Sequence, residues 1–228
     1  MKKVLITGAT GNLGTTVTKR FLAENYQVLI THSPGKKTPN LLTGTVPYET
    51  DLSSEASANA TVQRIIAEHG TLDAAVLLAG GFAAGGLAET DGKALEKMFS
   101  INFNTTYFVA RAVFQQMVTQ PTGGRIIVVG ARPVLRPTDG KNLVAYTLSK
   151  TLVFKLAELL NAEGAAKNVV TSVIVPSTID TETNRQAMPN ADFTKWVSPN
   201  DIAEAMIYIC SEKGQPLRES VIKMYGRS

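Results

Sequence analysis

The chain has 228 residues, a formal net charge of +4 at pH 7, 44% hydrophobic residues and 18% charged residues. This length fits one large domain, and this hydrophobic content is enough to build a buried core, so an intrinsically disordered protein is excluded. The apolar runs are too short to span a membrane, and the basic residues are scattered, which argues against both a membrane protein and a nucleic-acid-binding protein.

Strand-like and helix-like runs alternate along the whole chain, a pattern typical of parallel βαβ units. The predicted strands are Lys3–Thr7, Gln27–Thr31, Thr45–Thr50, Ala74–Ala79, Arg125–Gly130, Val169–Val175 and Ser220–Met224. The predicted helices are Leu13–Glu24, Ser54–His69, Gly92–Phe99, Asn102–Thr119, Ala145–Asn161 and Pro199–Ser211. A helix after each strand supplies the right-handed crossover that parallel neighbours require. The sequence therefore predicts one α/β domain over residues 1–228, a Rossmann-type doubly wound parallel sheet of about seven strands with helices on both faces.

The first predicted strand leads into a glycine loop with the spacing G-x-x-G-x-x-G. Glycine at these positions lets the backbone turn sharply and lets a pyrophosphate approach the N–H groups at the start of the following helix. A tight structural turn without a ligand is the alternative. The residues predicted to bind a dinucleotide here are Gly8, Thr10, Gly11, Asn12, Leu13 and Gly14.

The second predicted strand ends without the carboxylate that often holds the adenosine ribose hydroxyls. The chain offers His32, Ser33, Lys36 and Lys37 in this region. Imidazole, hydroxyl and ammonium groups suit a 2′-phosphate, so we predict that NADP(H) is the preferred cofactor, with NAD(H) possible. A solvated loop is the alternative for the two lysines.

The third and fourth predicted strands also end at candidate cofactor residues. Asp51 and Leu52 follow the third strand, and the Asp51 carboxylate could accept a hydrogen bond from the adenine amino group or cap the next helix. The fourth strand leads into Ala79, Gly80 and Gly81, where the lack of bulky side chains would let the cofactor lie close to the backbone. Simple packing is the alternative.

Tyr146 and Lys150 lie four residues apart at the start of an apolar helical run, and this spacing places both side chains on one face of a helix. A phenol titrates near pH ~10, and a neighbouring ammonium stabilises the phenolate and lowers that pKa. We therefore predict that Tyr146 relays a proton and that Lys150 tunes it and bonds the nicotinamide ribose. In an arbitrary helix the same spacing would leave Tyr packed and Lys exposed.

With these motifs the chain resembles the short-chain dehydrogenase/reductase superfamily over nearly its full length. Tyr146 and Lys150 match the catalytic pair of the family, and Asn102 matches the family asparagine that holds a proton-relay water near the lysine. A polar helix kink is the alternative for Asn102. The family serine after the fifth strand is absent, and Ala131 takes its place. Leu78 likewise replaces the asparagine of the usual Asn-Ala-Gly stretch.

Within that superfamily the chain is similar to dihydropteridine reductase, chiefly in the long loop at about 176–198. The matching residues of the loop are Asp180, Thr181, Asn184, Arg185, Met188, Pro189, Ala191, Asp192, Phe193 and Trp196. Pro176 and Thr178 follow the sixth strand, where the superfamily contacts the nicotinamide amide. The predicted substrate contacts are Phe82, Ala131, Asn184, Met188 and Trp196. For the loop residues, a lid that packs without touching ligand is the alternative.

The resemblance implies reduction of a quinonoid dihydropterin by NAD(P)H, with Tyr146 as the proton donor. An electron-poor ring accepts hydride without a carbonyl that needs polarising, which makes the missing serine intelligible. Dihydropteridine reductase usually prefers NADH and carries an acidic residue after the second strand, which is absent here. The alternatives are another serine-less reductase, acting on quinones or carbonyls, and a non-enzymatic NAD(P) sensor.

The partners expected are a small-molecule substrate and further copies of the chain, because the resemblance implies a homodimer or homotetramer. No nucleic acid, membrane or metal partner is predicted. The only cysteine, Cys210, lies in the last predicted helix and is expected to be a buried structural thiol. A single thiol forms no intrachain disulfide, which suits a reducing compartment and predicts a cytoplasmic protein.

Overall fold

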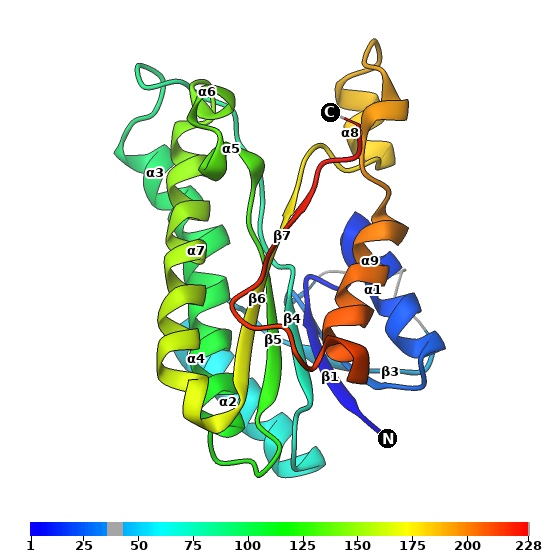
Figure 1. The fold of residues 1–228 in the computed structure, drawn as a ribbon. Helices are drawn as coiled ribbons and strands as arrows, with labels where there is room; N and C mark the ends of the chain where they lie inside the picture. The colour runs from blue at the N-terminus through cyan, green and yellow to red at the C-terminus, as the bar shows by residue number, and fades with distance from the viewer. Residues whose placement is uncertain (36–42, 228) are drawn as a thin grey trace.

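The computed structural model describes residues 1–35 and 43–227. Lys36 and Lys37, predicted near the cofactor, lie outside the described residues. The described chain forms one seven-stranded sheet in which every neighbouring pair is parallel, in the order β3-β2-β1-β4-β5-β6-β7 (Figure 1). The strands are β1 (Lys3–Thr7), β2 (Gln27–His32), β3 (Thr45–Glu49), β4 (Ala74–Leu77), β5 (Gly124–Val129), β6 (Val169–Pro176) and β7 (Val221–Met224). The predicted fold class is confirmed.

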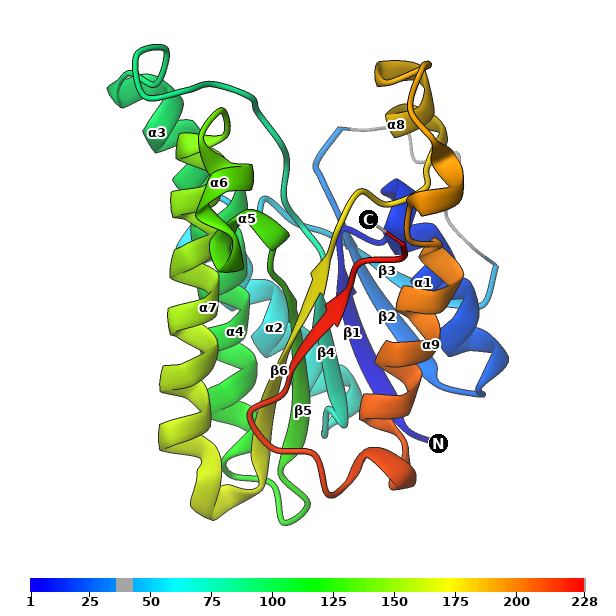
Figure 2. The same ribbon diagram turned by 45° about the horizontal axis from the view of Figure 1, so that its top comes forward.

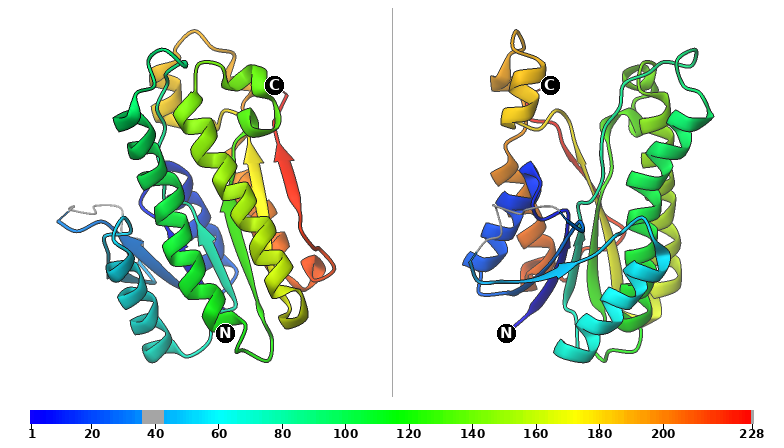
Figure 3. Two further views of the ribbon diagram at one scale, coloured as in Figure 1. Left: turned by 90° about the vertical axis from the view of Figure 1, so that its left-hand side faces the viewer. Right: turned by 180° about the vertical axis from the view of Figure 1, so that it is seen from behind.

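Helices cover both faces of the sheet and make three layers, which both views in Figure 3 show. One face is covered by α1 (Asn12–Ala23) and α9 (Pro199–Cys210). The other face is covered by α2 (Glu55–His69), α4 (Thr105–Met117) and α7 (Val144–Gly164). The shorter helices are α3 (Gly92–Met98), α5 (Arg132–Leu135), α6 (Pro137–Gly140) and α8 (Glu182–Ala187).

The strands supply the core because side chains alternate along them and both faces are covered. In β1, Leu5 points into the cluster under α2, α4 and α7, while Val4 and Ile6 point into the cluster under α1 and α9. All three are fully buried. Burying a side chain of this size stabilises the fold by about 1.5–3 kcal/mol. This two-sided burial explains why the strands are nearly continuous apolar runs in the sequence.

The order of strands reverses between β1 and β4, and ligands of doubly wound sheets bind outside such a reversal. The two strand ends are joined tightly here. The hydroxyl of Thr7 accepts hydrogen bonds from the backbone N–H groups of Leu78 and Ala79, at 3.1 and 3.2 Å. Figure 2 shows the loops that rise from this edge of the sheet. The fold therefore directs the glycine loop and the loop after β4 toward one crevice.

The chain from α3 to α4 is one continuous helical segment, whereas the sequence predicted two helices separated by a gap. The join is a π-helical turn, Phe99–Asn104. A π-turn adds one residue to a helix, so it rotates the side chains on either side relative to each other, and it is frequent at functional sites. The predicted helix boundary at Asn102 was therefore wrong, although it fell within this irregular turn.

The short helices α5, α6 and α8 were not predicted from the sequence. Each has only four to six residues, too few to show a helical period of apolar residues. The catalytic-pair helix α7 is longer than predicted and ends at Gly164. A Cβ at Gly164 would lie 2.7 Å from the carbonyl oxygen of Val169, so the helix end packs directly against β6.

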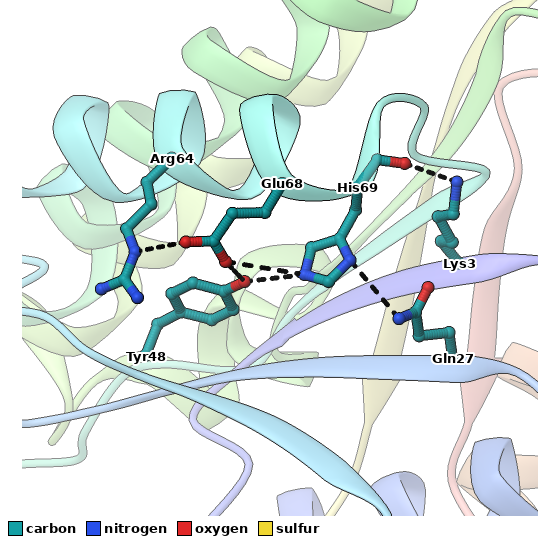
Figure 4. Close-up of polar contacts among 6 residues, drawn as sticks. All are labelled: Lys3, Gln27, Tyr48, Arg64, Glu68 and His69. Carbon is teal, nitrogen blue, oxygen red and sulfur yellow. Dashed lines mark hydrogen bonds and ion pairs between the residues drawn. The ribbon is translucent and has the colours of Figure 1, made fainter.

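A polar network attaches the end of α2 to the sheet (Figure 4). The hydroxyl of Tyr48 donates to the carboxylate of Glu68 at 2.6 Å and lies 2.8 Å from Nε2 of His69. Arg64 donates to the other oxygen of Glu68, at 2.7 Å, and Lys3 donates to the backbone oxygen of His69. Burial and the Glu68 carboxylate together raise the pKa of Tyr48 to about 12, so the phenol stays protonated and keeps donating.

The described helices are each too short or too polar to span a bilayer. Cys210 lies at the end of α9 and is 7% exposed, as the sequence predicted. Burial raises the pKa of this thiol to about 12, so it is protonated and unreactive at neutral pH.

Candidate active site

A cleft of about 450 Å³ opens at the carboxyl ends of β1, β2, β3 and β4. Nine of the predicted cofactor residues line it: Gly8, Thr10, Gly11, His32, Ser33, Asp51, Leu52, Ala79 and Gly80. The remaining residues that line the cleft were not predicted to bind the cofactor: Thr31, Thr50, Ser53, Leu78, Ile101 and Thr105. The cleft therefore lies at the reversal of strand order, as expected for a ligand site of this fold.

The glycine loop is built so that no side chain intrudes on its turn. Gly8 has φ +66°, and a Cβ there would lie 2.8 Å from the backbone of Leu78 and Ala79. At Gly14 a Cβ would lie 2.0 Å from the backbone oxygen of Gly8. Both positions therefore require glycine, Gly8 for the left-handed turn and Gly14 for the close packing of α1 against the loop.

The first turn of α1 is open toward a ligand, because no side chain caps it. The first N–H groups of a helix have no partner within the helix and attract anions. The side chains of two residues predicted to bind the cofactor in this turn have partners within the protein. The Asn12 amide donates to the Thr183 hydroxyl of α8 at 2.8 Å, and Leu13 packs against the core under α1 and α9. The cofactor contacts of Asn12 and Leu13 stay predictions.

The end of β2 presents hydroxyl and imidazole groups to the cleft and no carboxylate. Thr31 is 3% exposed, lines the cleft, and its Oγ1 has no hydrogen-bond partner among the described residues. An orphaned buried hydroxyl is costly unless a ligand completes it. His32 and Ser33 continue this wall of the cleft, and Lys36 lies outside the described residues.

Asp51 does not cap the next helix, which was one of the two roles predicted for it. Ser54 caps α2 instead, accepting from the N–H of Ser57 at 3.3 Å. The Asp51 carboxylate accepts from the hydroxyl of Ser53 at 2.6 Å and from its N–H at 2.9 Å. These bonds, the hydroxyl first, lower the pKa of Asp51, so an ionised acceptor faces the cleft.

These features fit a dinucleotide. The uncapped helix start and the glycine loop suit a pyrophosphate, and the orphaned Thr31 hydroxyl and the Asp51 carboxylate suit the adenosine half. Across the described residues no group of three or more His, Cys, Asp and Glu side chains is placed to hold a metal ion.

At the other end of the cleft, Gly80, Asn102 and Lys150 pack tightly together. A Cβ on Gly80 would lie 2.6 Å from Oδ1 of Asn102 and 3.7 Å from Nζ of Lys150. Oδ1 of Asn102 accepts from the N–H of Gly81 at 2.9 Å, while its amide donates to the hydroxyl of Ser149 at 3.1 Å. The side chain of Asn102, fully buried, thus joins the loop after β4 to helix α7.

Lys150 is buried at the centre of this cluster, being 8% exposed. Its Nζ donates to the backbone oxygen of Val129 at 2.9 Å. Burial disfavours the charged form and lowers the pKa of Lys150 to about 8. Near neutral pH the ammonium is still the main form, but it is much closer to releasing its proton than an ordinary lysine.

Tyr146 lies one turn before Lys150 on α7, and its ring meets the ring of Phe82 edge-on with centroids 5.1 Å apart. Burial raises the pKa of Tyr146 to about 12. The sequence had predicted that the lysine would lower this pKa, and that prediction was wrong, because desolvation of the phenol dominates here. A phenol with this pKa is fully protonated at neutral pH and can serve as a proton donor.

Ala131, predicted to stand where the family serine would lie, is buried at the start of α5, being 4% exposed. No hydroxyl is therefore supplied from this position. Phe82, in contrast, is 65% exposed, and among the predicted substrate residues its ring contacts the ring of Tyr146.

The loop after β6, which includes α8, lies beyond the carboxyl ends of the strands, on the side of the sheet that α1 and α9 cover (Figure 2). Pro176 is buried as the last residue of β6, and the backbone oxygen of Thr178 accepts from the N–H of Val197 at 3.0 Å. The Asn184 amide donates to the backbone oxygen of Ile179 at 2.8 Å and therefore supports the loop itself.

Two further loop residues were predicted to contact substrate. Trp196 packs against the ring of Phe193, with centroids 4.7 Å apart, whereas Met188 is 41% exposed. The contact between Phe193 and Trp196 stabilises the loop. The substrate contacts of Met188 and Trp196 stay predictions.

A family model described as short chain dehydrogenase matches residues 2–192. The chain is 25% identical over 232 residues to dihydropteridine reductase of Dictyostelium discoideum, covering 100% of this chain and 96% of that protein. It is 29% identical over 185 residues to the probable oxidoreductase EphD of Mycobacterium tuberculosis, covering 78% of this chain. The chain spans only 31% of the length of EphD.

Solved structures share the fold. The structure titled ElxO with NADP bound superposes with a TM-score of 0.89 at 24% identity, covering 99% of this chain and 97% of that one. A short-chain dehydrogenase/reductase from Mycobacterium ulcerans gives a TM-score of 0.89 at 21% identity, covering 99% of this chain and 89% of that one.

Proposed function

The chain belongs to the short-chain dehydrogenase family, and we propose that within it this protein is an NADP(H)-dependent reductase of a quinonoid dihydropterin or a similar electron-poor ring. The match to a dihydropteridine reductase over both full lengths supports this substrate class. The dinucleotide-shaped cleft and the NADP of one structural relative support the cofactor class.

One observation carries the proposal: the site combines the protonated Tyr146 and the buried Lys150 with Ala131, which has no hydroxyl, where the family serine is expected. Family members that act on a carbonyl use a serine to hold the carbonyl oxygen, and a single donor of this kind is worth about 3–4 kcal/mol in the transition state. Ala131 offers none. A substrate whose ring takes up hydride directly does not need that donor, whereas it still needs a proton.

Tyr146 supplies that proton. When bound, NADPH would supply the hydride. The pKa of Tyr146, raised to about 12 by burial, keeps the phenol loaded at neutral pH, which favours reduction over oxidation. After the phenol has given its proton to a ring nitrogen, the Lys150 ammonium, one helical turn away and with a pKa of about 8, is the acid that would restore it. Asn102 joins this helix to the loop after β4 through its hydrogen bonds with Ser149 and with the N–H of Gly81.

The substrate assay tests the reaction. Wild type should oxidise NADPH when a quinonoid dihydropterin is supplied. Tyr146→Phe should lower kcat by about 10²–10⁴-fold, the usual contribution of a positioned acid, with little change in the Kd for NADPH. Tyr208→Phe, which removes the hydroxyl of a 48% exposed tyrosine on α9, is the matched control and should retain full activity. An unchanged kcat in Tyr146→Phe would refute the proton-donor role.

The substrate class is tested by a panel. Quinones and ketones should be reduced more slowly than the dihydropterin. Faster reduction of quinones would indicate that quinones, and not pterins, are the substrate class. Binding of NADPH without turnover of any compound would indicate a sensor.

The cofactor preference is tested at the end of β2. His32 stands where a carboxylate would repel a 2′-phosphate. Titrations of the wild type should show tighter binding of NADPH than of NADH. His32→Asp should weaken NADPH binding by more than about tenfold, the effect of one charge interaction of about 1.4 kcal/mol, and leave NADH binding nearly unchanged. Equal affinities in the wild type would contradict the preference for NADP(H).

We propose that the protein is a homodimer or homotetramer that assembles through α4 and α7. Tyr107, Leu148 and Leu159 expose 36%, 46% and 61% of their surface on these two helices. Apolar patches on paired helices favour burial against a second copy. Sedimentation equilibrium should give a multimer, and Leu159→Glu should shift it toward monomer.

A further inference from the structure

A second cavity, of about 160 Å³, lies at the opposite edge of the sheet from the candidate active site, at the amino ends of β4 and β5. Its walls come from five separate parts of the chain, including the N-terminus, which Figure 1 shows at the foot of the sheet. The polar residues that line it are Lys2, Tyr26, Asp73, Thr122, Arg125 and Gln215. Nothing in the proposed reduction uses this cavity.

Arg125 is the unusual member of this cavity, because it is a buried charge held only by neutral groups. Its side chain is 7% exposed. The guanidinium donates to the backbone oxygens of Gly124 and Asn168 at 3.3 and 3.2 Å, and to the side-chain oxygen of Gln215 at 3.2 Å. All three distances lie at the long limit for an N–H···O bond.

No ion pair among residues 1–35 and 43–227 includes Arg125 or Lys2. A buried charge is normally paired, since an unpaired one keeps most of its desolvation cost. Arg218, which donates to Asn168 from outside, adds a second positive charge near Arg125. Burial first, and this neighbour second, lower the pKa of Arg125. The guanidinium lacks a negative partner of its own.

The opposite wall adds a further cation with unused donors. Nζ of Lys2 donates to the backbone oxygen of Cys210 at 3.3 Å, and the hydroxyl of Tyr26 donates to the same oxygen at 3.1 Å. An ammonium has three donors and a guanidinium five, so both Lys2 and Arg125 retain N–H groups for a ligand.

The charge of the cavity is also unbalanced. Asp73 is the one carboxylate that lines it, and that carboxylate accepts from the backbone N–H of Lys3 at 2.8 Å. Against this one negative charge stand the two cations that line the cavity, Lys2 and Arg125, while Arg218 lies near enough to lower the pKa of Arg125. The lining therefore keeps a net positive charge, which an oxyanion would neutralise. The volume equals that of about five water molecules, enough for a tetrahedral oxyanion with some of its hydration.

We propose that this cavity binds a small tetrahedral oxyanion, inorganic phosphate, between Lys2 and Arg125. The anion would tie the N-terminus to the start of β5 and to the end of α9, three segments that are distant in the sequence. Arg125 would hold it through its planar fork and Lys2 as a point charge.

The test is calorimetric titration of inorganic phosphate at constant ionic strength, into the free protein and into protein saturated with NADPH. Saturation fills the phosphate-binding groups of the cofactor cleft, so binding that persists belongs to another site. If NADPH does not bind, the free protein still provides the test, and the two proposals fail separately. We expect one saturable site in both samples, for which sulfate competes and chloride does not.

Three variants localise the site. Lys2→Gln, at an exposed position that the fold tolerates, should raise the Kd for phosphate by about tenfold, the effect of one charge-assisted hydrogen bond. Lys93→Gln makes the same charge change at an exposed position of α3 and should leave the Kd unchanged. Asp73→Asn removes the repelling charge but keeps an oxygen for the Lys3 N–H, and should lower the Kd severalfold.

The Asp73→Asn variant separates binding from folding, because a damaged structure would not bind phosphate more tightly. Three results would overturn the proposal: no saturable binding of phosphate, an equal effect of Lys2→Gln and Lys93→Gln, or an unchanged or higher Kd in Asp73→Asn.

Discussion

Replacing Lys150 by methionine should stabilise the fold at neutral pH and at the same time abolish reduction. Lys150 is 8% exposed, and its charge is held in the interior by one hydrogen bond to the backbone oxygen of Val129. Burial lowers its pKa from 10.5 to about 8. At 1.36 kcal/mol per pH unit, the buried ammonium costs the folded state about 3 kcal/mol.

Methionine has a similar length and no charge, so it removes that cost. The variant loses the bond to Val129, a contribution of about 1 kcal/mol. The net expectation at pH 7 is a stabilisation of about 2 kcal/mol, which corresponds to a rise in Tm of about 4–8 °C for a domain of this size.

The stability difference between Lys150→Met and the wild type should depend on pH. Below pH 8 both the folded and the unfolded chain hold the proton on Lys150, and the cost is fully present. Between pH 8 and 10.5 the folded protein has released this proton while the unfolded chain still binds it, so the stability of the wild type rises with pH. The advantage of the methionine variant should therefore shrink across this window.

The measurement is urea unfolding of both proteins at pH 7, 8, 9 and 10, where only the difference between them is interpreted. Lys155→Met is the matched control on the same helix, because that side chain is 65% exposed and its partner is the surface residue Glu158. It should change stability by less than about 0.5 kcal/mol at every pH. A Lys150→Met variant less stable than wild type at pH 7, or a difference that does not vary with pH, would refute the reasoning.

Three further experiments test other parts of the structure. Gly14→Ala places a Cβ 2.0 Å from a backbone oxygen of the glycine loop. In a fluorescence titration it should weaken NADPH binding by more than about tenfold, and it should destabilise the fold by about 1–3 kcal/mol. Gly92→Ala, where no atom lies within 4 Å of the added Cβ, is the control and should have neither effect. A double-mutant cycle of Asn102→Ala and Ser149→Ala should give a coupling free energy of about 1 kcal/mol in urea unfolding, and strictly additive effects would show that their hydrogen bond does not join the loop to α7. Tyr48→Phe should lower the free energy of unfolding by about 1–3 kcal/mol, because the hydroxyl of Tyr48 joins β3 to Glu68 and His69 at the end of α2. An unchanged urea midpoint would contradict that role.

The strands, and the helix that carries the candidate pair Tyr146 and Lys150, could be predicted from the sequence because their signals are local. A parallel strand buried on both faces is a short run of apolar residues, so every predicted strand lies within two residues of its observed bounds. The glycines that the turn requires, and a tyrosine and lysine one helical turn apart, are likewise visible in neighbouring residues. The local pattern thus determined the fold class and the place of the cleft.

Properties that depend on contacts between distant segments could not be predicted in this way. The pKa of Tyr146 moves opposite to the prediction because the surrounding core desolvates the phenol. The Asn12 amide donates to Thr183, 171 residues away, and the buried hydroxyl of Thr31 has no hydrogen-bond partner in the part of the chain that the structure describes.

The cavity around Arg125 shows the same division. In the sequence this arginine is one charge at the start of an apolar strand, and nothing nearby marks it as buried. The tertiary structure brings Gln215 and Asn168 to it and Lys2 into the same cavity, and among the described residues it forms no ion pair. Sequence periodicity determined which segments form the sheet, whereas burial and charge balance, which sum over residues far apart in the chain, were decided only when the sheet and its helices came together.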